Sequence, residues 1–222
     1  MYVGRIMHTD LITVSPSTSL EDASILIKKK KIDHLPVIND SGKLVGILSD
    51  RDLKQYWASP ATSLSNHELN YLLQQVLVEM VMIKTVITIS PGTTIERAAL
   101  IMQENDINAL PVMEDDHLVG IITSTDVMGV LLSAIGISDD SVRLGVMVKD
   151  SIGSLAEVSE ILRKEEINIQ SLFSWPEKEH NGVYQLVMRI PENDGQKAID
   201  ALNRNGYKVI LKYEEEITPF LP

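Results

Sequence analysis

The chain of 222 residues contains no cysteine, and only 5% of its residues are aromatic. Without cysteine it can form neither a disulfide framework nor a thiolate metal site. The absence of cysteine also agrees with a reducing compartment, so we expect a cytoplasmic protein.

Long apolar runs are lacking as well. No stretch approaches the roughly 20 consecutive apolar residues that a membrane-spanning helix needs, and the longest run, near 127–137, is interrupted by Ser133 and by glycines. The first residues, MYVGRIMHTDL, show no basic head followed by an apolar run. We therefore expect neither a signal peptide nor membrane insertion.

Basic residues are in the minority, with 20 Lys and Arg against 31 Asp and Glu and a net charge of −11. A protein that binds a nucleic-acid backbone usually has a basic face. The one basic run, Lys28 to Lys31, is typical of a solvated helix end, where cations interact favourably with the helix dipole. We expect no nucleic-acid partner.

Common catalytic signatures are also missing. The sequence has no Gly-x-Ser-x-Gly motif, no P-loop and no His-x-x-x-His pair. Four histidines show no spacing that indicates metal ligation, namely His8, His67, His117 and His180. We expect a protein that is not an enzyme and that needs neither a metal nor a catalytic cofactor.

An internal repeat organises the first part of the chain. Residues 5–38 align with residues 80–113 at a shift of 75, and the LVGI of 44–47 then matches the LVGI of 118–121 at a shift of 74. So many matches in one register indicate a duplication. We place the first copy at 1–58 and the second at 79–138, joined by a linker at 59–78.

Both copies carry the same pattern of expected elements. A short β run (LITVS or VITIS) ends at Ser-Pro, and an amphipathic helix with an acid in its first turn follows. LPVI or LPVM and LVGIL or LVGII then predict a hairpin, before a second helix. Each β-α-β-β-α copy has little core of its own, so we expect the two to pack as a pseudo-twofold pair. Within the linker, SPATSLSN predicts a loop and HELNYLLQQVLVEM an amphipathic helix.

A different pattern begins near residue 141. Alternating and helical segments follow in the order β-α-β-β-α-β, which is the ferredoxin-like arrangement. The last helix is expected to stop at Gly206, and YKVILKYEE is expected to be the last strand. We assign 141–215 to this domain and 216–222 to a tail, so the fold class is α+β throughout.

One short sequence motif occurs in both copies, as GILSDRD at 46–52 and GIITSTD at 120–126. Its hydroxyl and its acid, Ser49 with Asp52 and Thr123 with Asp126, have the spacing of a helix capping box. The same groups could instead form a nucleotide site, because a helix N-terminus binds anions and a carboxylate can accept hydrogen bonds from a ribose diol. The spacing alone leaves both interpretations open.

Both copies resemble the CBS (cystathionine-β-synthase) domain, and two in tandem resemble a Bateman module. The resemblance covers about 1–136 and implies up to two cleft sites for AMP, ADP, ATP or S-adenosylmethionine. It implies ribose contacts for the two aspartates and phosphate contacts for the two hydroxyls. The resemblance also implies cleft-lining positions for Ile12, His34, Ile87 and Ala109. Arg51, whose charge favours an anion, and Thr125 complete the candidate nucleotide-binding residues.

Charge distinguishes the two copies. Residues 1–58 hold eight Lys and Arg and seven Asp and Glu, a net of +1, whereas residues 79–136 hold two and eight, a net of −6. Because anions favour basic surroundings, we expect the half-site of Ser49 and Asp52 to bind the more highly phosphorylated ligand. The other half-site is expected to be empty or to take a neutral or cationic adenosine compound, although a cleft mixes residues of both copies.

Residues 142–213 resemble an ACT domain, a small regulatory fold that often binds amino acids across a dimer interface. The usual Asp-x-Pro-Gly turn is here Asp150-Ser151-Ile152-Gly153, so Ile152 replaces the proline. The resemblance implies effector contacts for Asp150, Ile152, Gly153 and Asn168. A tight turn and simple pairing with a second copy are the alternative.

Together these features predict a regulatory sensor, a homodimer or higher homo-oligomer that binds an adenosine compound and alters a partner. CBS repeats followed by an ACT domain resemble a family of acetoin-utilization proteins linked to growth on acetoin or butanediol. The alternative is a ligand-free adaptor that holds a partner enzyme. If the sensor hypothesis holds, Asp52→Ala should abolish the thermal shift caused by a nucleotide and leave melting without ligand nearly unchanged.

Overall fold

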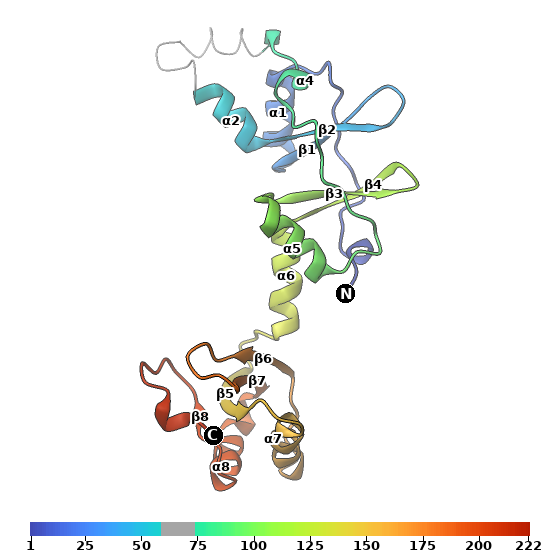
Figure 1. Ribbon diagram of the computed structural model, residues 1–222. Coiled ribbons are helices and arrows are strands. Elements are labelled where there is room, and N and C mark those ends of the chain that lie inside the picture. The colour runs from blue at the N-terminus through green and yellow to red at the C-terminus, as the bar shows by residue number, and fades with distance from the viewer. Residues whose placement is uncertain (59–73) are drawn as a thin grey trace. The chain divides into compact units, whose positions relative to one another are not determined.

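The computed structural model describes residues 1–58 and 74–222. The chain divides into two compact units, Met1–Met128 and Gly129–Pro222 (Figure 1). The boundary falls inside helix α6 (Ser124–Ile135), which the sequence analysis placed wholly in the second copy.

The first unit contains both copies of the repeat, and their elements correspond one to one. The first copy comprises α1 (Leu20–Lys30), β1 (His34–Ile38), β2 (Leu44–Ser49) and α2 (Asp50–Ala58). The second comprises α5 (Ile95–Asn105), β3 (Ala109–Glu114), β4 (His117–Thr123) and α6. A 3-10 helix, Val3–Arg5, lies at the start of the first copy, and α4 (Val78–Val81) lies at the start of the second.

The first helix of each copy begins and ends at equivalent residues. The hydroxyl of Ser19 caps α1 by accepting from the Asp22 N–H, and that of Thr94 caps α5 by accepting from the Arg97 N–H. Lys31 and Asp106 end the two helices in the left-handed conformation, with φ of 54° and 51°. The expected helix starts are thereby confirmed.

The short β runs expected before these helices are reduced to single bridges. Val14 bridges Val37 and Ile89 bridges Val112, both in parallel orientation. The Ser-Pro turn that follows at once ends the pairing, since proline has no N–H to continue a ladder. The prediction of a strand in these two places was therefore wrong in extent.

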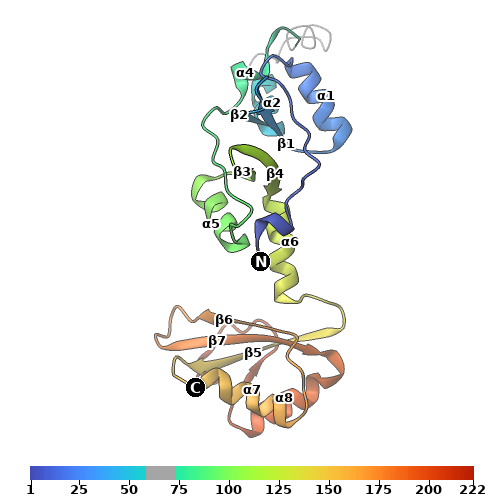
Figure 2. The same ribbon diagram turned by 90° about the vertical axis from the view of Figure 1, so that its right-hand side faces the viewer.

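The N-terminal segment of each copy crosses to the hairpin of the other copy. His8 pairs with Ile121 of β4, and Ile83 pairs with Ile47 of β2, both antiparallel. The crossing needs glycine in the receiving strand, because a Cβ on Gly46 would lie 2.4 Å from the Met82 sulfur and one on Gly120 would lie 2.5 Å from the Met7 sulfur. This exchange ties the two hairpins together, and they lie side by side in both views (Figures 1 and 2).

The apolar face of each helix packs on its own hairpin. In the first copy the core is built by Leu20, Ala23 and Ile27 of α1 with Leu35, Val37 and Leu48 of the hairpin. In the second, Ile95, Ala98 and Met102 of α5 are buried as the helical spacing predicted. The buried faces leave the hairpin ends and the following helix starts at the surface of the pair.

The second unit is a four-stranded antiparallel sheet with two helices on one face (Figure 2). Its elements are β5 (Ser141–Lys149), α7 (Ser154–Lys164), β6 (Ser171–Pro176), β7 (Val183–Pro191), α8 (Gly195–Arg204) and β8 (Val209–Ile210), with 3-10 helices at Glu192–Asp194 and Thr218–Phe220. The sheet order β6-β7-β5-β8 is the ferredoxin-like order that the sequence pattern predicts. Its core lies between sheet and helices, where Leu144, Val158 and Met188 are fully buried.

Three further expectations concern the last strand, Gly206 and the linker. The last strand, expected over 207–215, has only two residues, Val209 and Ile210, which pair with Val146 and Gly145. Gly206 follows α8 with a φ of 88°, as expected of a helix stop. The loop and the first half of the helix expected in the linker lie outside the described residues. In the described half the expectation of a continuous helix was wrong, because Leu77 is extended and bridges Ser19 just before α4.

Candidate functional site

A pocket of about 1220 Å³ opens in the first unit, and both copies of the repeat line it. Its volume exceeds the roughly 300–1,000 Å³ that is common for a single small-molecule site. The walls come from the starts of α2 and α6, from the ends of α1 and α5, and from the two crossing segments. The two copies therefore contribute equivalent elements to the pocket wall.

In the first copy, Ser49 and Asp52 form a capping box at the start of α2. One carboxylate oxygen of Asp52, Oδ2, accepts from the Ser49 N–H at 2.8 Å and from its hydroxyl at 2.6 Å. The Ser49 hydroxyl oxygen in turn accepts from the Asp52 N–H at 3.2 Å. The interpretation of the repeated motif as a helix capping box is confirmed for this copy.

Thr123 and Asp126 repeat that geometry at the start of α6. Asp126 Oδ2 accepts from the Thr123 N–H at 2.8 Å and from its hydroxyl at 2.6 Å. Because the cap uses only one oxygen of each carboxylate, the other oxygen is left for a second task. Capping and ligand binding are therefore compatible, and the expectation that Asp52→Ala leaves melting unchanged is revised, since the substitution also removes a cap.

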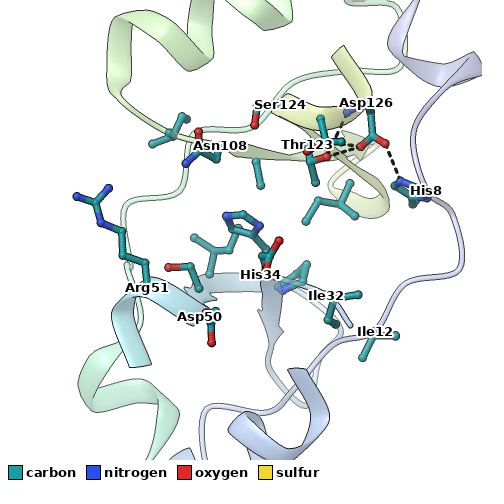
Figure 3. A pocket seen from close by; sticks show the side chains of 18 of the residues that line it. His8, Ile12, Ile32, His34, Asp50, Arg51, Asn108, Thr123, Ser124 and Asp126 are labelled. Atoms are coloured by element: carbon teal, nitrogen blue, oxygen red, sulfur yellow. Dashed lines mark hydrogen bonds and ion pairs between the residues drawn. The ribbon is translucent and has the colours of Figure 1, made fainter. Parts of the chain in front are cut away.

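Asp126 has a further partner that Asp52 lacks among the described residues. Its second oxygen, Oδ1, accepts a hydrogen bond from Nε2 of His8 at 3.0 Å (Figure 3). The His8 side chain is 62% exposed and that of Asp126 is 18% exposed. Burial raises the pKa of Asp126, but the hydrogen bonds from Thr123 and His8 outweigh it, so this pKa lies below its ordinary value.

His34, at the start of β1, points into the middle of the pocket (Figure 3). Its Nδ1 atom is buried and has no hydrogen-bond partner within residues 1–58 and 74–222. Burial lowers the pKa of His34, and the negative charges of Asp33 and Asp52 offset this only in part. The imidazole is therefore held in its neutral form more strongly than an exposed one.

The structure brings nine of the ten candidate nucleotide-binding residues to the pocket wall. They are Ile12, His34, Ser49, Arg51, Asp52, Ala109, Thr123, Thr125 and Asp126. Ile87 is half-buried and does not line the pocket, although its equivalent Ile12 does. Ile47, Ile83 and Ile121 supply apolar wall instead.

Several polar lining residues were missed by the sequence analysis. The most consequential are His8, Asp10, Lys31, Asp33, Asp50, Asp106 and Asn108. A local signal existed for Lys31 and Asp106, which stand at equivalent helix ends. No local signal existed for His8, because its contact with Asp126 spans 118 residues of sequence.

Positive charge is unevenly distributed over the pocket wall. The described lining contains one lysine, Lys31, and one arginine, Arg51, and both belong to the first copy. Their equivalents in the second copy are Asp106 and Thr125. Arg51 lies on the same side of the pocket as Asn108 of the second copy (Figure 3). The first copy therefore supplies the cations of the described lining. It also supplies four aspartates, against Asp106 and Asp126 of the second copy, so the net formal charge of the lining is −2 from each copy.

The four effector candidates of the second unit do not share one pocket. Asp150, Ile152 and Gly153 lie in the exposed turn before α7, where Gly153 has a φ of 99°. Asn168 lines a shallow depression together with Ser159 and Arg163 of α7. Asp150, Ile152 and Gly153 do not line this depression, so the turn and Asn168 do not form one site there.

Two tandem copies that each contribute a hydroxyl–carboxylate pair to one pocket define a paired ligand-binding module. The sequence model of the CBS domain family matches residues 3–59 and 78–133. The chain belongs to the CBS domain family.

The similar proteins include enzymes and solved CBS domain pairs. A homoserine O-acetyltransferase of Methanohalobium evestigatum is 33% identical over 127 residues, which are 57% of this chain and 23% of that enzyme. The chain thus spans about a quarter of the length of the curated relatives it matches first. The solved CBS domain pair of protein MJ0100, in complex with 5′-methylthioadenosine and S-adenosyl-L-methionine, is 27% identical with a TM-score of 0.52, covering 60% of this chain and 97% of that one.

A second solved structure is a Vibrio cholerae protein provisionally assigned as the acetoin utilization protein AcuB. It is 29% identical with a TM-score of 0.50, and the likeness covers 60% of this chain and 91% of that one. Both likenesses support the paired CBS fold.

Two absences in the described part of the chain bear on other kinds of site. Residues 1–58 and 74–222 contain no helix long and apolar enough to cross a membrane. The same residues contain no group of three or more His, Asp or Glu side chains placed to hold a metal ion.

Proposed function

We propose that the chain is a regulatory ligand-sensing protein that binds an adenosine-containing nucleotide between its CBS repeats. The observation that carries the proposal is the convergence of both hydroxyl–carboxylate pairs on one pocket of about 1220 Å³. The two half-sites are the Asp52 half-site, with Ser49 and Arg51, and the Asp126 half-site, with Thr123 and Thr125.

The chemistry of each half-site suits a nucleoside. Asp52 keeps one carboxylate oxygen that can accept from a ribose diol, while Oδ2 stays engaged in the cap. Ile32, Ile47 and Ile121 offer apolar wall to a base. The bound 5′-methylthioadenosine and S-adenosyl-L-methionine of the MJ0100 pair support an adenosine ligand of this general kind.

The position of the two cations, rather than the net charge of the lining, favours different ligands in the two half-sites. Arg51 and Lys31 favour phosphate, so AMP, ADP or ATP is proposed for the Asp52 half-site. The Asp126 half-site has Asp106 in place of Lys31, so a neutral or cationic compound such as S-adenosylmethionine suits it better.

For the second unit we propose an ACT-like regulatory domain that binds an amino acid or another small effector. The ferredoxin-like sheet order supports the fold. Asn168 supplies an amide at the depression beside α7, whereas Arg163 of that depression is already paired with Glu160 at 2.6 Å. Asp150, Ile152 and Gly153 remain candidates through the turn before α7.

The likeness to the Vibrio cholerae protein supports a role like that of AcuB in acetoin or butanediol utilization. In this role the protein is a non-catalytic cytoplasmic homodimer that acts on a partner enzyme. The alternative is an adaptor that binds no small molecule and only scaffolds that partner.

Thermal unfolding with AMP, ADP, ATP and S-adenosylmethionine separates the sensor from the adaptor. A ligand at 100 times its dissociation constant should stabilise the folded protein by about 2.7 kcal/mol. Asp52→Asn should remove most of this gain for AMP, because an amide offers one acceptor oxygen where the carboxylate offers two. That one oxygen can still accept from the Ser49 N–H, so the loss of intrinsic stability should stay below about 1 kcal/mol.

Asp22→Asn is the matched control. Asp22 forms the same kind of box with Ser19, whose hydroxyl donates to Asp22 Oδ2 at 2.8 Å, but it does not line the pocket. The control should lose similar intrinsic stability and keep the full ligand shift. If none of the four ligands shifts the wild type, the adaptor replaces the sensor.

A further inference from the structure

The two carboxylates of the pocket differ in how many hydrogen bonds they can still accept. Each carboxylate oxygen has about two acceptor positions. In both copies Oδ2 uses its two positions for the N–H and hydroxyl of the residue that caps the helix. Only Oδ1 therefore remains for a ligand.

His8 takes one of the remaining positions on Asp126. Its Nε2 lies 3.0 Å from Asp126 Oδ1, and because an ionised carboxylate only accepts, Nε2 must be the donor. Oδ1 of Asp52 has no hydrogen-bond partner within the described ranges 1–58 and 74–222. A ribose diol thus finds two free positions at Asp52 and one at Asp126.

The difference arises from one position of the repeat. His8 lies in the segment that crosses to β4, and its equivalent in the segment that crosses to β2 is Ile83. Both residues line the pocket. An isoleucine side chain donates no hydrogen bond, so the Asp52 half-site has no counterpart of the histidine.

We infer that His8 is a specificity-determining residue that makes the Asp126 half-site the weaker of the two for any nucleoside with a ribose diol. The inference deepens the proposed function and rests on it. It differs from the charge argument, because it applies to an uncharged nucleoside as much as to a nucleotide. Since the His8 side chain is 62% exposed and can swing away, it lowers affinity rather than abolishing binding.

Adenosine is the appropriate probe, because it carries the diol but no phosphate. Calorimetric titration of the full wild-type chain should show one tighter and one weaker event. Asp52→Asn should remove the tighter event and Asp126→Asn the weaker one. His8→Ile, which copies the first half-site, should tighten the weaker event about tenfold, the usual worth of a hydrogen bond to a charged group.

The reciprocal variant and a modified ligand provide controls. Ile83→His places a donor beside Asp52 and should weaken the tighter event. With 2′-deoxyadenosine, which has no diol, His8→Ile should change neither event. Thermal unfolding of each variant without ligand shows that it remains folded.

The possible failures are distinguishable. If neither adenosine nor AMP binds the wild type or the variants, the proposed function fails and this inference with it. If adenosine binds but His8→Ile leaves the weaker event unchanged, or tightens 2′-deoxyadenosine equally, the inference is overturned while the nucleotide site stands.

Discussion

His34 should make the stability of the first unit depend on pH. Burial holds its folded-state pKa below the ordinary 6.5, so between these two pKa values the unfolded chain binds more protons than the folded chain. Stability should therefore fall as the pH drops from about 7 through 6.5 towards the lowered pKa. His34→Ala copies Ala109 of the second copy and should flatten this part of the profile, as measured by urea unfolding at several pH values.

A smaller polar side chain tests the cause. His34→Gln keeps hydrogen-bonding groups at the site but does not titrate, so it should flatten the profile as His34→Ala does. A profile as steep as that of the wild type in both variants would show that another group causes the loss of stability at low pH.

Local spacing explains which site residues the sequence could predict. Ser49 and Asp52 are three residues apart at a helix start, so their contact follows from helix geometry alone. The contact of His8 with Asp126 depends on a segment that crosses to the other copy, and periodicity carries no information about such a crossing. Repeat equivalence can also mislead. Ile87 was predicted as the equivalent of Ile12, but only Ile12 lines the pocket.

The crossing segments should be sensitive to a single added methyl group. In Gly46→Ala the new Cβ would meet the Met82 sulfur at 2.4 Å and the Ile83 carbonyl oxygen at 3.2 Å. We expect a loss of about 1–3 kcal/mol in the free energy of unfolding, as for other overpacked sites. Chemical denaturation measures it, and Gly120→Ala should behave alike because Met7 stands in the same place.

Gly92→Ala is the matched control for these glycines. Its Cβ would meet only the Ser90 hydroxyl oxygen, at 3.8 Å, and its φ is not in the left-handed region. This variant should be neutral or slightly stabilising, since alanine reduces the freedom of the unfolded chain. A Gly46→Ala variant as stable as Gly92→Ala would contradict the tight crossing described here.

The length of the elements was predicted less well than their order. The β runs before α1 and α5 became single bridges because the Ser-Pro turn ends the ladder after one residue pair. The strand at 207–215 has two residues, Val209 and Ile210, although its sequence alternates over a longer stretch. Propensity marks where a strand can form, whereas partner strands decide how far it extends.

The arrangement of the whole chain was predictable because it is repetitive in one part and patterned in the other. The duplication in residues 1–136 required two similar packed copies, and the β-α-β-β-α-β order after residue 141 left few sheet topologies. What the sequence did not reveal is that the unit boundary lies within α6, at Met128 and Gly129. A continuous helical pattern gives no sign of where one set of contacts ends and the next begins.

Separate cores predict that the two units unfold separately. The core around Leu20, Leu35 and Leu48 includes no residue after Met128, and the core around Leu144 and Met188 includes none before Gly129. The described residues that line the pocket of the first unit all lie within Met7–Asp126. A fragment of residues 1–138, which keeps α6 whole, should therefore fold and bind AMP with the affinity of the full chain.

Scanning calorimetry of the full chain should accordingly show two transitions. AMP at 100 times its dissociation constant should raise only the one that the 1–138 fragment reproduces, by an amount that corresponds to about 2.7 kcal/mol. The other transition should respond to an effector of the second unit instead. A fragment that binds AMP more than about fivefold more weakly than the full chain would mean that the nucleotide site depends on the second unit. A loss of that size corresponds to about 1 kcal/mol of missing interaction. A single transition would contradict separate unfolding of the two units.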